Sequence, residues 1–201
     1  VSFGELLRKQ PLGAAGGLIV LLMLLATVFA NVLSPYDPEA ASFEHMLMPP
    51  NADFWFGTDA FGRDILTRII YGARTALFVG FTAAFVGATA GLVLGVASAY
   101  FGGLFDLIFQ RVVDVIMAFP LIVLALAVVA TLGASTTNVI IAITIPFIPQ
   151  CARVVRSSAL AIREIPYVDA ARALGFGHAR IILRHMVPNV MAPYLIMLTT
   201  F

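Results

Sequence analysis

Few side chains in this sequence could take part in chemistry. Its 201 residues include 12 Lys and Arg, 11 Asp and Glu, three His and one Cys. A phosphate-cradling Gly-rich loop ends in Gly-Lys-Ser/Thr, but the only lysine, Lys9, lies between Arg8 and Gln10. The His-Glu-x-x-His and Gly-x-Ser-x-Gly motifs of zinc proteases and serine hydrolases are also absent from the sequence. We therefore predict no catalytic residue, and any use of ATP would need an ATPase on another chain.

The three histidines are the candidate metal ligands. His45 lies beside Met46 and Met48 in one predicted loop, and imidazole suits nickel. One imidazole with two thioethers is a thin ligand set, so a solvated loop is the interpretation we favour. His178 and His185 are seven residues apart, and we expect them to serve helix ends. The sequence therefore predicts no metal site.

Composition indicates the solvent in which these residues are positioned. The chain is 61% hydrophobic and 11% charged, whereas soluble domains carry about 25% charged residues. Such a chain folds in lipid, and we predict an all-α, polytopic membrane helix bundle. The single Cys151 excludes an internal disulfide and is interpreted as a small apolar residue in a helix.

Uncharged runs predict the membrane spans, because about 20 apolar residues cross the hydrocarbon as a helix. Residues 12–33 and 75–101 each predict one span, and residues 115–152 are too many for one. The turn-forming residues 133–138 divide this third run into two helices. A fifth run, residues 186–201, is cut short by the end of the sequence. We read the chain as truncated at its C-terminus, with five spans present and a sixth expected beyond it.

Lys and Arg in short flanking segments indicate the orientation of the spans. With a cytoplasmic N-terminus, nine of the twelve basic residues lie inside. These are Arg8, Lys9, Arg111, Arg153, Arg156, Arg163, Arg172, Arg180 and Arg184. The predicted organisation is a cytoplasmic N-terminus with the first span in residues 1–33, an external loop in residues 34–74 and the core of the bundle in residues 75–201.

The external loop contains a predicted interfacial helix. Thr58 or Asp59 can cap it, and its apolar face lies opposite an Asp64–Arg68 pair at i,i+4. Aromatic residues 54–56 would anchor this helix at the level of the lipid headgroups. A structural brace and a contact with an external binding protein are both open as its role.

Small residues and prolines predict how the spans pack. One face of the second span would let a neighbouring backbone approach, and we favour ordinary helix packing over a substrate groove for it. This face contains Gly80, Ala84, Ala88 and Gly91. Prolines interrupt the predicted third and fourth helices, either as hinges or as static bends. They are Pro120, Pro146 and Pro149.

Residues 153–187 carry six of the twelve basic residues, yet lie between two hydrophobic spans. Pro166 suits a first helical turn, and Gly175 is well placed to end that helix. A second short helix is predicted from Gly177 to Met186, with Pro188 stopping it. The residue types of this helix–glycine–helix knob, a short pair of helices on the surface, are compatible with two roles. It could dock into a partner's groove or lie on anionic lipid headgroups.

The residues of this knob closely resemble the coupling motif of ABC-importer permeases. That motif reads Glu-Ala-Ala, three residues, Gly, nine residues, then Ile, any residue, Leu and Pro. The alanine pair, Gly175 and Pro188 keep its register, while Asp169 replaces Glu and His185 and Val187 replace Ile and Leu. The resemblance implies coupling helices at about residues 157–187 that dock into a separate ATPase. The implied coupling residues are Asp169, Ala170, Ala171, Arg172, Gly175 and Pro188.

A second resemblance narrows the family. The external segment resembles one in permeases for dipeptides, oligopeptides and nickel, of the type with a single N-terminal span. Its matching residues are Gly57, Thr58, Asp59, Gly62, Arg63 and Asp64. The two resemblances together imply the type I ABC-importer permease (MetI-like) fold and a location in the bacterial inner membrane. They also imply half of a translocation path for peptides or nickel, with the substrate left open.

The same resemblance implies the partners. These are a second permease subunit, two ATP-binding-cassette ATPase subunits and an external substrate-binding protein, besides the lipid membrane. ATP and Mg would be bound by the ATPases, so that no cofactor is expected on this chain, and no nucleic acid is expected.

Two other classes of protein were weighed against a permease. An ion-coupled secondary transporter is disfavoured, because the uncharged runs contain no ionisable residue and no inverted repeat is obvious. A membrane scaffold without transport activity would leave the coupling-type motif unexplained.

Near the inner end of the third helix, Arg111 and Asp114 can pair at i,i+3 beside Asp106. We predict a structural clamp there, with a gating role open.

Overall fold

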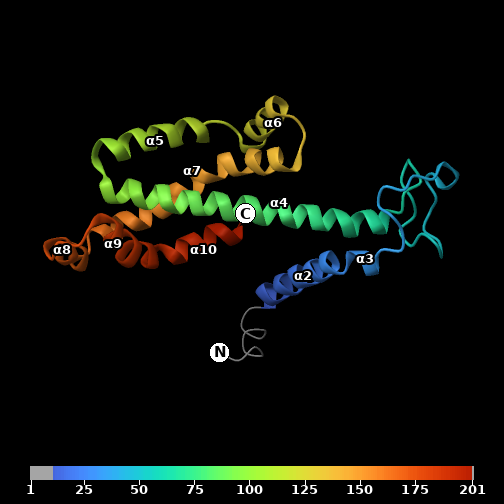
Figure 1. The fold of residues 1–201 in the computed structure, drawn as a ribbon, viewed down its shortest axis with the longest axis horizontal. Coiled ribbons are helices and arrows are strands. Elements are labelled where there is room, and N and C mark those ends of the chain that lie inside the picture. The colour runs from blue at the N-terminus through green and yellow to red at the C-terminus, as the bar shows by residue number, and fades with distance from the viewer. Residues whose placement is uncertain (1–10, 201) are drawn as a thin grey trace. The chain divides into compact units, whose positions relative to one another are not determined.

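The computed structural model describes residues 11–200, and within them all regular structure is helical apart from one isolated bridge between Thr58 and Asp64. Arg8 and Lys9, which entered the orientation count, lie outside the described residues. The helices are α2 (Pro11–Val28), α3 (Ala30–Leu33), α4 (Ile65–Phe101), α5 (Gly103–Met117), α6 (Leu121–Leu132), α7 (Thr136–Arg163), α8 (Pro166–Ala173), α9 (His178–Ile181) and α10 (Met191–Thr200), as labelled in Figure 1.

The chain forms two units, one ending at Phe78 and the other beginning at Val79. Helix α4 begins in the first unit and continues through the second. Four helical segments are long and apolar enough to cross a membrane, and the bent pair α5–α6 adds a fifth if it counts as one span. The four are Pro11–Val28, Ile65–Phe101, Thr136–Arg163 and His178–Thr200. The prediction of an all-α bundle is confirmed, with four to five apolar spans in the described residues.

Helix α4 begins at Ile65, so the separate interfacial helix predicted before the second span is wrong. Asp64 caps α4, because its Oδ2 accepts a hydrogen bond of 2.8 Å from the backbone N–H of Thr67. No Gly-Pro or Asn-Gly break separates this start from the apolar run, so one helix of 37 residues forms. At 1.5 Å per residue it extends over about 55 Å, which exceeds the hydrocarbon thickness.

The chain bends near the start of the third apolar run, between α5 and α6. Helices α5 and α6 meet at 87°, and Pro120 immediately precedes α6. The predicted division at residues 133–138 is confirmed, since α6 ends at Leu132 and Ser135 caps α7 by accepting a hydrogen bond of 3.2 Å from the Asn138 backbone.

Two prolines lie inside α7 without ending it. Pro146 and Pro149 are both buried within the 28 residues of this helix, so the interruption predicted there is wrong. A proline in a helix interior removes one backbone hydrogen bond, but α7 is held on both sides of the prolines by packing of its buried face. Membrane helices tolerate proline where neighbouring protein surrounds it.

The contact between α4 and α7 forms the centre of the second unit, where the two helices run in the same direction (Figure 1). A Cβ atom at Gly91 would lie 2.6 Å from the Cβ of Cys151. One at Gly95 would lie 2.6 Å from the carbonyl oxygen of Ala152. These glycines therefore permit the close approach of the two backbones.

The predicted small-residue face is confirmed in part. Ala84, Ala88 and Gly91 are buried, whereas Gly80 is exposed and has no atom within 4 Å of its Cβ position. Cys151 is fully buried in a helix, as predicted, and its thiol lies 3.4 Å from the Ala88 carbonyl oxygen. The face serves helix packing, which was the favoured interpretation.

Candidate coupling surface and external motif

The segment that resembles a coupling motif forms a short helix, a glycine turn and a second helical stretch. Helix α8 ends in a Schellman motif, in which the N–H of Phe176 bonds the Ala171 carbonyl at 3.1 Å and that of Gly175 bonds the Arg172 carbonyl at 2.9 Å. Gly175 has a φ of +78°, which other residues rarely adopt. The predicted helix from Pro166 to the Gly175 turn is therefore confirmed.

The second helical stretch does not stop at Pro188, and that prediction is wrong. After α9 the chain continues through a wide π-type turn at Ile182–Met186 and a 3-10 turn at Val187–Val190 into α10. Pro188 stands in the first turn of the 3-10 segment, where its missing N–H costs no helical hydrogen bond. The coupling segment, residues 157–187, is thus joined to α10 without an intervening loop.

One face of α8 is buried and the other is free. Val168 and Ala171 are 0% and 4% exposed and pack in one cluster with Tyr100 of α4 and Val155 of α7. Asp169, Ala170, Arg172 and Gly175 are exposed. All four are accessible, as the predicted docking residues would need to be, although the Arg172 guanidinium also lies over the Tyr100 ring of α4. Ala171 does not join them, because it fills the contact with the helices beneath.

The coupling segment is attached to the ends of two long helices by specific polar contacts. The hydroxyl of Tyr100 lies 2.8 Å from His178 Nδ1, and the Arg172 guanidinium lies over the Tyr100 ring at 5.2 Å. Arg163 donates from Nη1 to the Ala99 carbonyl at 2.8 Å, which satisfies a free carbonyl at the end of α4. A displacement of α8 and α9 must therefore also act on the last turn of α4.

Tyr167 and Asn189 hold the two halves of the segment together. The hydroxyl of Tyr167 donates to the His185 carbonyl at 3.0 Å, and Asn189 Nδ2 donates to the same carbonyl at 2.7 Å. The His185 ring stacks on Phe176 with 19° between the planes. Sequence reasoning missed Tyr167 and Asn189 as supporting residues. The signal in the sequence that could have indicated them is their position directly after Pro166 and Pro188.

Charged residues of α5 pair with α7. Arg111 and Asp114 approach to 3.9 Å, as predicted, but Arg153 lies closer to Asp114, at 2.5 Å. A second pair, which sequence reasoning missed, joins Asp106 to Arg156. Their separation of 50 residues gives no local spacing from which to predict this pair.

The external motif, residues 57–64, is folded in upon the loop that precedes it. A Cβ atom at Gly57 would collide with the Met48 carbonyl oxygen, and one at Gly62 with the Ser42 carbonyl oxygen. Both glycines have φ values near +70°, at +73° and +71°. Thr58 is 4% exposed; its hydroxyl donates to the His45 carbonyl and accepts from the Met48 N–H at 2.9 Å.

The acidic residues of the external motif are bonded within it. Asp59 accepts from Arg63 Nε at 2.8 Å and from the backbone of Phe61 at 2.8 Å. Burial acts to raise the pKa of Asp59, but the hydrogen bonds from Arg63 and Phe61 outweigh it and lower the pKa to about 2. Asp64 is 4% exposed and caps α4. Neither Thr58 nor Asp59 is the cap, which corrects that prediction.

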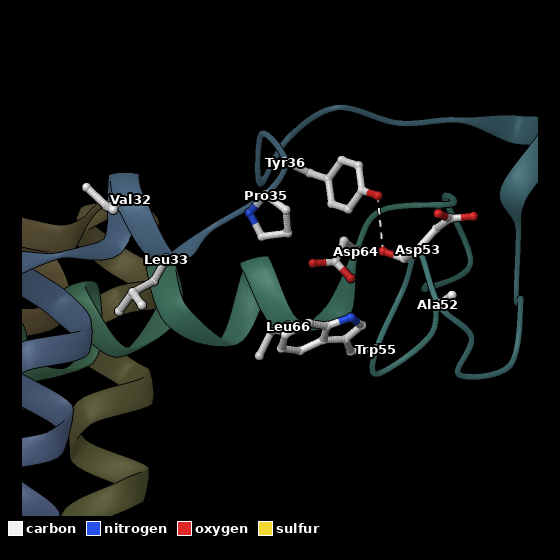
Figure 2. A pocket seen from close by; sticks show the side chains of 9 residues that line it. All are labelled: Val32, Leu33, Pro35, Tyr36, Ala52, Asp53, Trp55, Asp64 and Leu66. Carbon is white, nitrogen blue, oxygen red and sulfur yellow. Dashed lines mark hydrogen bonds between the residues drawn. The ribbon is translucent and has the colours of Figure 1, made fainter.

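A pocket of about 340 Å³ lies beside this motif (Figure 2). Asp64, Leu66 and Trp55 form one side of it and Tyr36 another, and the Tyr36 hydroxyl donates to the Asp53 carbonyl at 3.0 Å. Trp55 is 70% exposed. The position of Asp64 in this wall follows from its role as a helix cap.

His45 is engaged in the same loop. Its Nδ1 lies 2.8 Å from the Ser42 hydroxyl, and its ring lies 5.4 Å from that of Phe54. Within residues 11–200, no three His, Cys, Asp or Glu side chains are grouped so that they could hold a metal ion. These contacts hold the His45 side chain within the folded loop. The neighbouring Met46 is exposed, which fits the interpretation of a solvated loop for that residue.

The sequence matches two family models. Residues 87–200 match the family described as "Binding-protein-dependent transport system inner membrane component", and residues 5–50 match the "N-terminal TM domain of oligopeptide transport permease C". The first match covers more than half of the chain. This chain therefore belongs to the family of binding-protein-dependent transport system inner membrane components, as the resemblance in its sequence implied.

Relatives of this family carry names of peptide transporters. The chain is 47% identical to a putative peptide transport system permease protein of Brucella suis, over 90% of this chain and 62% of the relative. It is 41% identical to the dipeptide transport system permease protein DppC of Alkalihalophilus pseudofirmus, over 96% and 64%. A third relative is the glutathione transport system permease protein GsiD of Escherichia coli, at 37% identity over 98% and 66%.

The chain thus spans slightly less than two thirds of the length of these relatives. A solved structure described as "Crystal structure of an amino acid ABC transporter with histidines" is 21% identical, with a TM-score of 0.43, over 68% of this chain and 69% of the other. That likeness is too distant to add to the family assignment.

Proposed function

We propose that this chain is a permease subunit of an ATP-binding-cassette importer and forms half of the translocation path for dipeptides or oligopeptides. The observation that carries the proposal is the coupling segment, whose exposed residues lie on a base fixed to α4 and α7. The names of the relatives favour peptides over nickel. The permease itself carries out no ATP hydrolysis in this proposal.

The proposal includes the partners of such an importer. A second permease would complete the path, an external substrate-binding protein would deliver the peptide, and two ATPase subunits would bind ATP and Mg. The dependence on a binding protein is supported by the description of the family. Docking of the ATPases to the coupling segment requires its side to be cytoplasmic, which the excess of basic residues there supports.

The surface proposed to enter the ATPase is narrow and chemically simple. Ala170 and Gly175 present little side-chain volume, so that a groove in the partner can approach the backbone of the segment. Asp169 and Arg172, 3.2 Å apart, lie beside them as charges at the rim, which steer docking more than they tighten it. Ala171, buried beneath, links the docked helix to the core instead.

A pair of substitutions tests this surface in the full-length permease assembled with its partners in proteoliposomes. Ala170→Trp places a large side chain on the proposed docking face, and Ala41→Trp places the same side chain at an exposed position of the external loop, outside the coupling segment. We expect Ala170→Trp to abolish ATPase co-purification and ATP-dependent peptide uptake while membrane insertion stays normal. Equal uptake by the two variants would contradict the proposal, and uptake driven by an ion gradient alone would favour a secondary transporter.

A further inference from the structure

A partly buried polar cluster joins α4, α5 and α7 close to the coupling segment. Asp106 of α5 accepts from Arg156 of α7 at Nε, 2.6 Å, and at Nη2, 2.5 Å, and also from the hydroxyl of Ser98 of α4. The side chains of Asp106 and Arg156 are only 18% and 24% exposed, and Ser98 is fully buried. We name Ser98, Asp106 and Arg156 the polar clamp.

The surroundings of the clamp make its arrangement hard to change. Ser98 and Arg156 belong to helices long and apolar enough to cross a membrane, and Asp106 belongs to the bent α5–α6 pair. In such surroundings a charge is stable when it is paired and hydrogen-bonded. Separating Asp106 from Arg156 would leave two poorly solvated charges, a strongly unfavourable state. The clamp therefore fixes the first turns of α5 at one position relative to α4 and α7.

A second ion pair between the same helices offers a contrast. Asp114 and Arg153 lie 2.5 Å apart, but their side chains are 52% and 46% exposed. An exposed pair of this kind contributes little to stability, because water and salt solvate its charges separately. Of the two bridges between α5 and α7, only Asp106–Arg156 is enclosed enough to transmit a displacement.

The clamp residue Ser98 directly precedes the two residues of α4, Ala99 and Tyr100, that contact the coupling segment. Ser98 precedes Ala99, whose carbonyl accepts from Arg163, and Tyr100, whose hydroxyl lies 2.8 Å from His178 Nδ1. The last turn of α4 thus contacts the coupling segment through residues 99 and 100 and α5 through residue 98. A break at Gly102, with a φ of +62°, separates α4 from α5, so that the clamp supplements a short and flexible joint.

We propose that the polar clamp is a positioning element that passes movement of the coupling segment to the α5–α6 pair. A displacement of α8 and α9 reaches the last turn of α4 through Tyr100, and reaches α5 through Ser98, Asp106 and Arg156. The 87° bend between α5 and α6 then converts it into a movement of α6. This inference rests on the proposed function, because it concerns how ATP-driven movement would spread within the permease.

The first test compares two isosteric substitutions in the full-length permease assembled with its partners. Asp106→Asn removes the charge of the clamp, and Asp114→Asn removes the charge of the exposed pair on the same helix. We expect Asp106→Asn to lower the peptide taken up per ATP hydrolysed by about tenfold, a typical size for coupling between sites, while ATP hydrolysis continues. Asp114→Asn should change this ratio by less than about twofold.

Two further variants separate positioning from simple loss of structure. Ser98→Ala removes only the hydroxyl between α4 and α5, and should lower the same ratio with the ion pair intact. Exchange of the charges, Asp106→Arg with Arg156→Asp, should restore part of the ratio lost in Asp106→Asn. The inference is overturned if Asp106→Asn behaves like Asp114→Asn, or if uptake and hydrolysis fall in the same proportion in both Asp106→Asn and Ser98→Ala.

A distance measurement tests the clamp without reference to transport. Spin labels at Val112 of α5 and Ala173 of α8, both exposed, report the distance between α5 and the coupling segment in the full-length chain in nanodiscs. We expect one narrow distribution in the wild type and in Asp114→Asn, and a broader one in Ser98→Ala and Asp106→Asn. Unchanged distributions in both clamp variants would overturn the inference. A wild type without ATP-dependent uptake would instead refute the proposed function and leave this readout valid.

Discussion

The coupling segment and the external motif use the same residue types in opposite ways. Both contain a glycine with positive φ, an aspartate and an arginine in close sequence. In the external motif, Gly62 has no room for a side chain and Asp59 is bonded inward to Arg63. In the coupling segment, Gly175 has open space around it and Asp169 points outward. The external motif therefore holds its own loop together, while the coupling segment leaves its aspartate and its glycine exposed.

The difference bears on the two roles left open for the external loop. Its glycines, Thr58 and both aspartates make contacts within residues 42–67. The predicted role of a structural brace accounts for each of these contacts. A role in contacting a binding protein would fall to the exposed aromatic residues of the same loop, Trp55 and Phe56, instead.

The largest effect is expected from a methyl group at Gly62. Gly62→Ala meets the backbone of Ser42 and also has to adopt a positive φ, so that the loop must open to accommodate it. We expect a loss of about 3 kcal/mol in the free energy of unfolding of this unit. Limited proteolysis of the purified protein measures it, with cleavage in residues 42–57 rising sharply. Resistance equal to that of the wild type would show that the motif is not a brace.

These two regions also show what sequence can predict. The apolar runs, the turn at 133–138 and the helix ending at Gly175 follow from local patterns, and all were predicted correctly. The start of α4 was not, because a cap at Asp64 and one at Thr58 or Asp59 satisfy the same local rule. The bond from the Thr58 hydroxyl to the His45 carbonyl and the pairing of Asp59 with Arg63 decide between them, because they engage these two side chains elsewhere. The pairing of Asp106 with Arg156 depends on the packing of α5 against α7, which spacing does not contain.

Two neighbouring alanines sharpen the contrast within the coupling segment. Ala171→Leu adds three carbons to a position that is 4% exposed, and overpacking of this kind costs about 2 kcal/mol. Ala170→Leu adds the same atoms to the exposed face and should leave stability within about 0.5 kcal/mol. Thermal unfolding in detergent measures both.

The same pair separates an effect on docking alone from an effect on docking and stability together. Ala170→Leu should weaken co-purification of the ATPase while the fold remains stable. Ala171→Leu should weaken both together. If Ala171→Leu left stability unchanged and abolished docking alone, the assignment of Ala171 to the packed face would be wrong.

A smaller effect is expected at the glycine of the coupling segment. Gly175→Ala meets no neighbouring atom within 4 Å, so only the strain of a positive φ remains, about 1 kcal/mol. This loss should be clearly smaller than that of Gly62→Ala, although both add one methyl group to a glycine with a φ above +70°. Equal losses at the two positions would remove the distinction between a closed and an open glycine. Unfolding of the two variants in the same detergent provides the comparison.

The smallest effect concerns the pH dependence of the external motif. The pKa of Asp59 is lowered from 3.8 to about 2, so its charged form is favoured in the folded loop. The resulting stabilisation is fully present above pH 3.8 and is lost as the pH falls through about 2. The stability difference between the wild type and Asp59→Asn should therefore be constant from pH 7 to pH 4 and shrink below that.

The partner of Asp59 provides the matched variant. In Arg63→Gln the main hydrogen bond that lowers the pKa of Asp59 is weakened, so the stability difference caused by Asp59→Asn should be smaller at neutral pH. It should also disappear closer to pH 3.8, the ordinary value for this carboxyl group. If Arg63→Gln left the stability difference caused by Asp59→Asn unchanged at every pH, the hydrogen bond from Arg63 would not be what favours the charged form of Asp59.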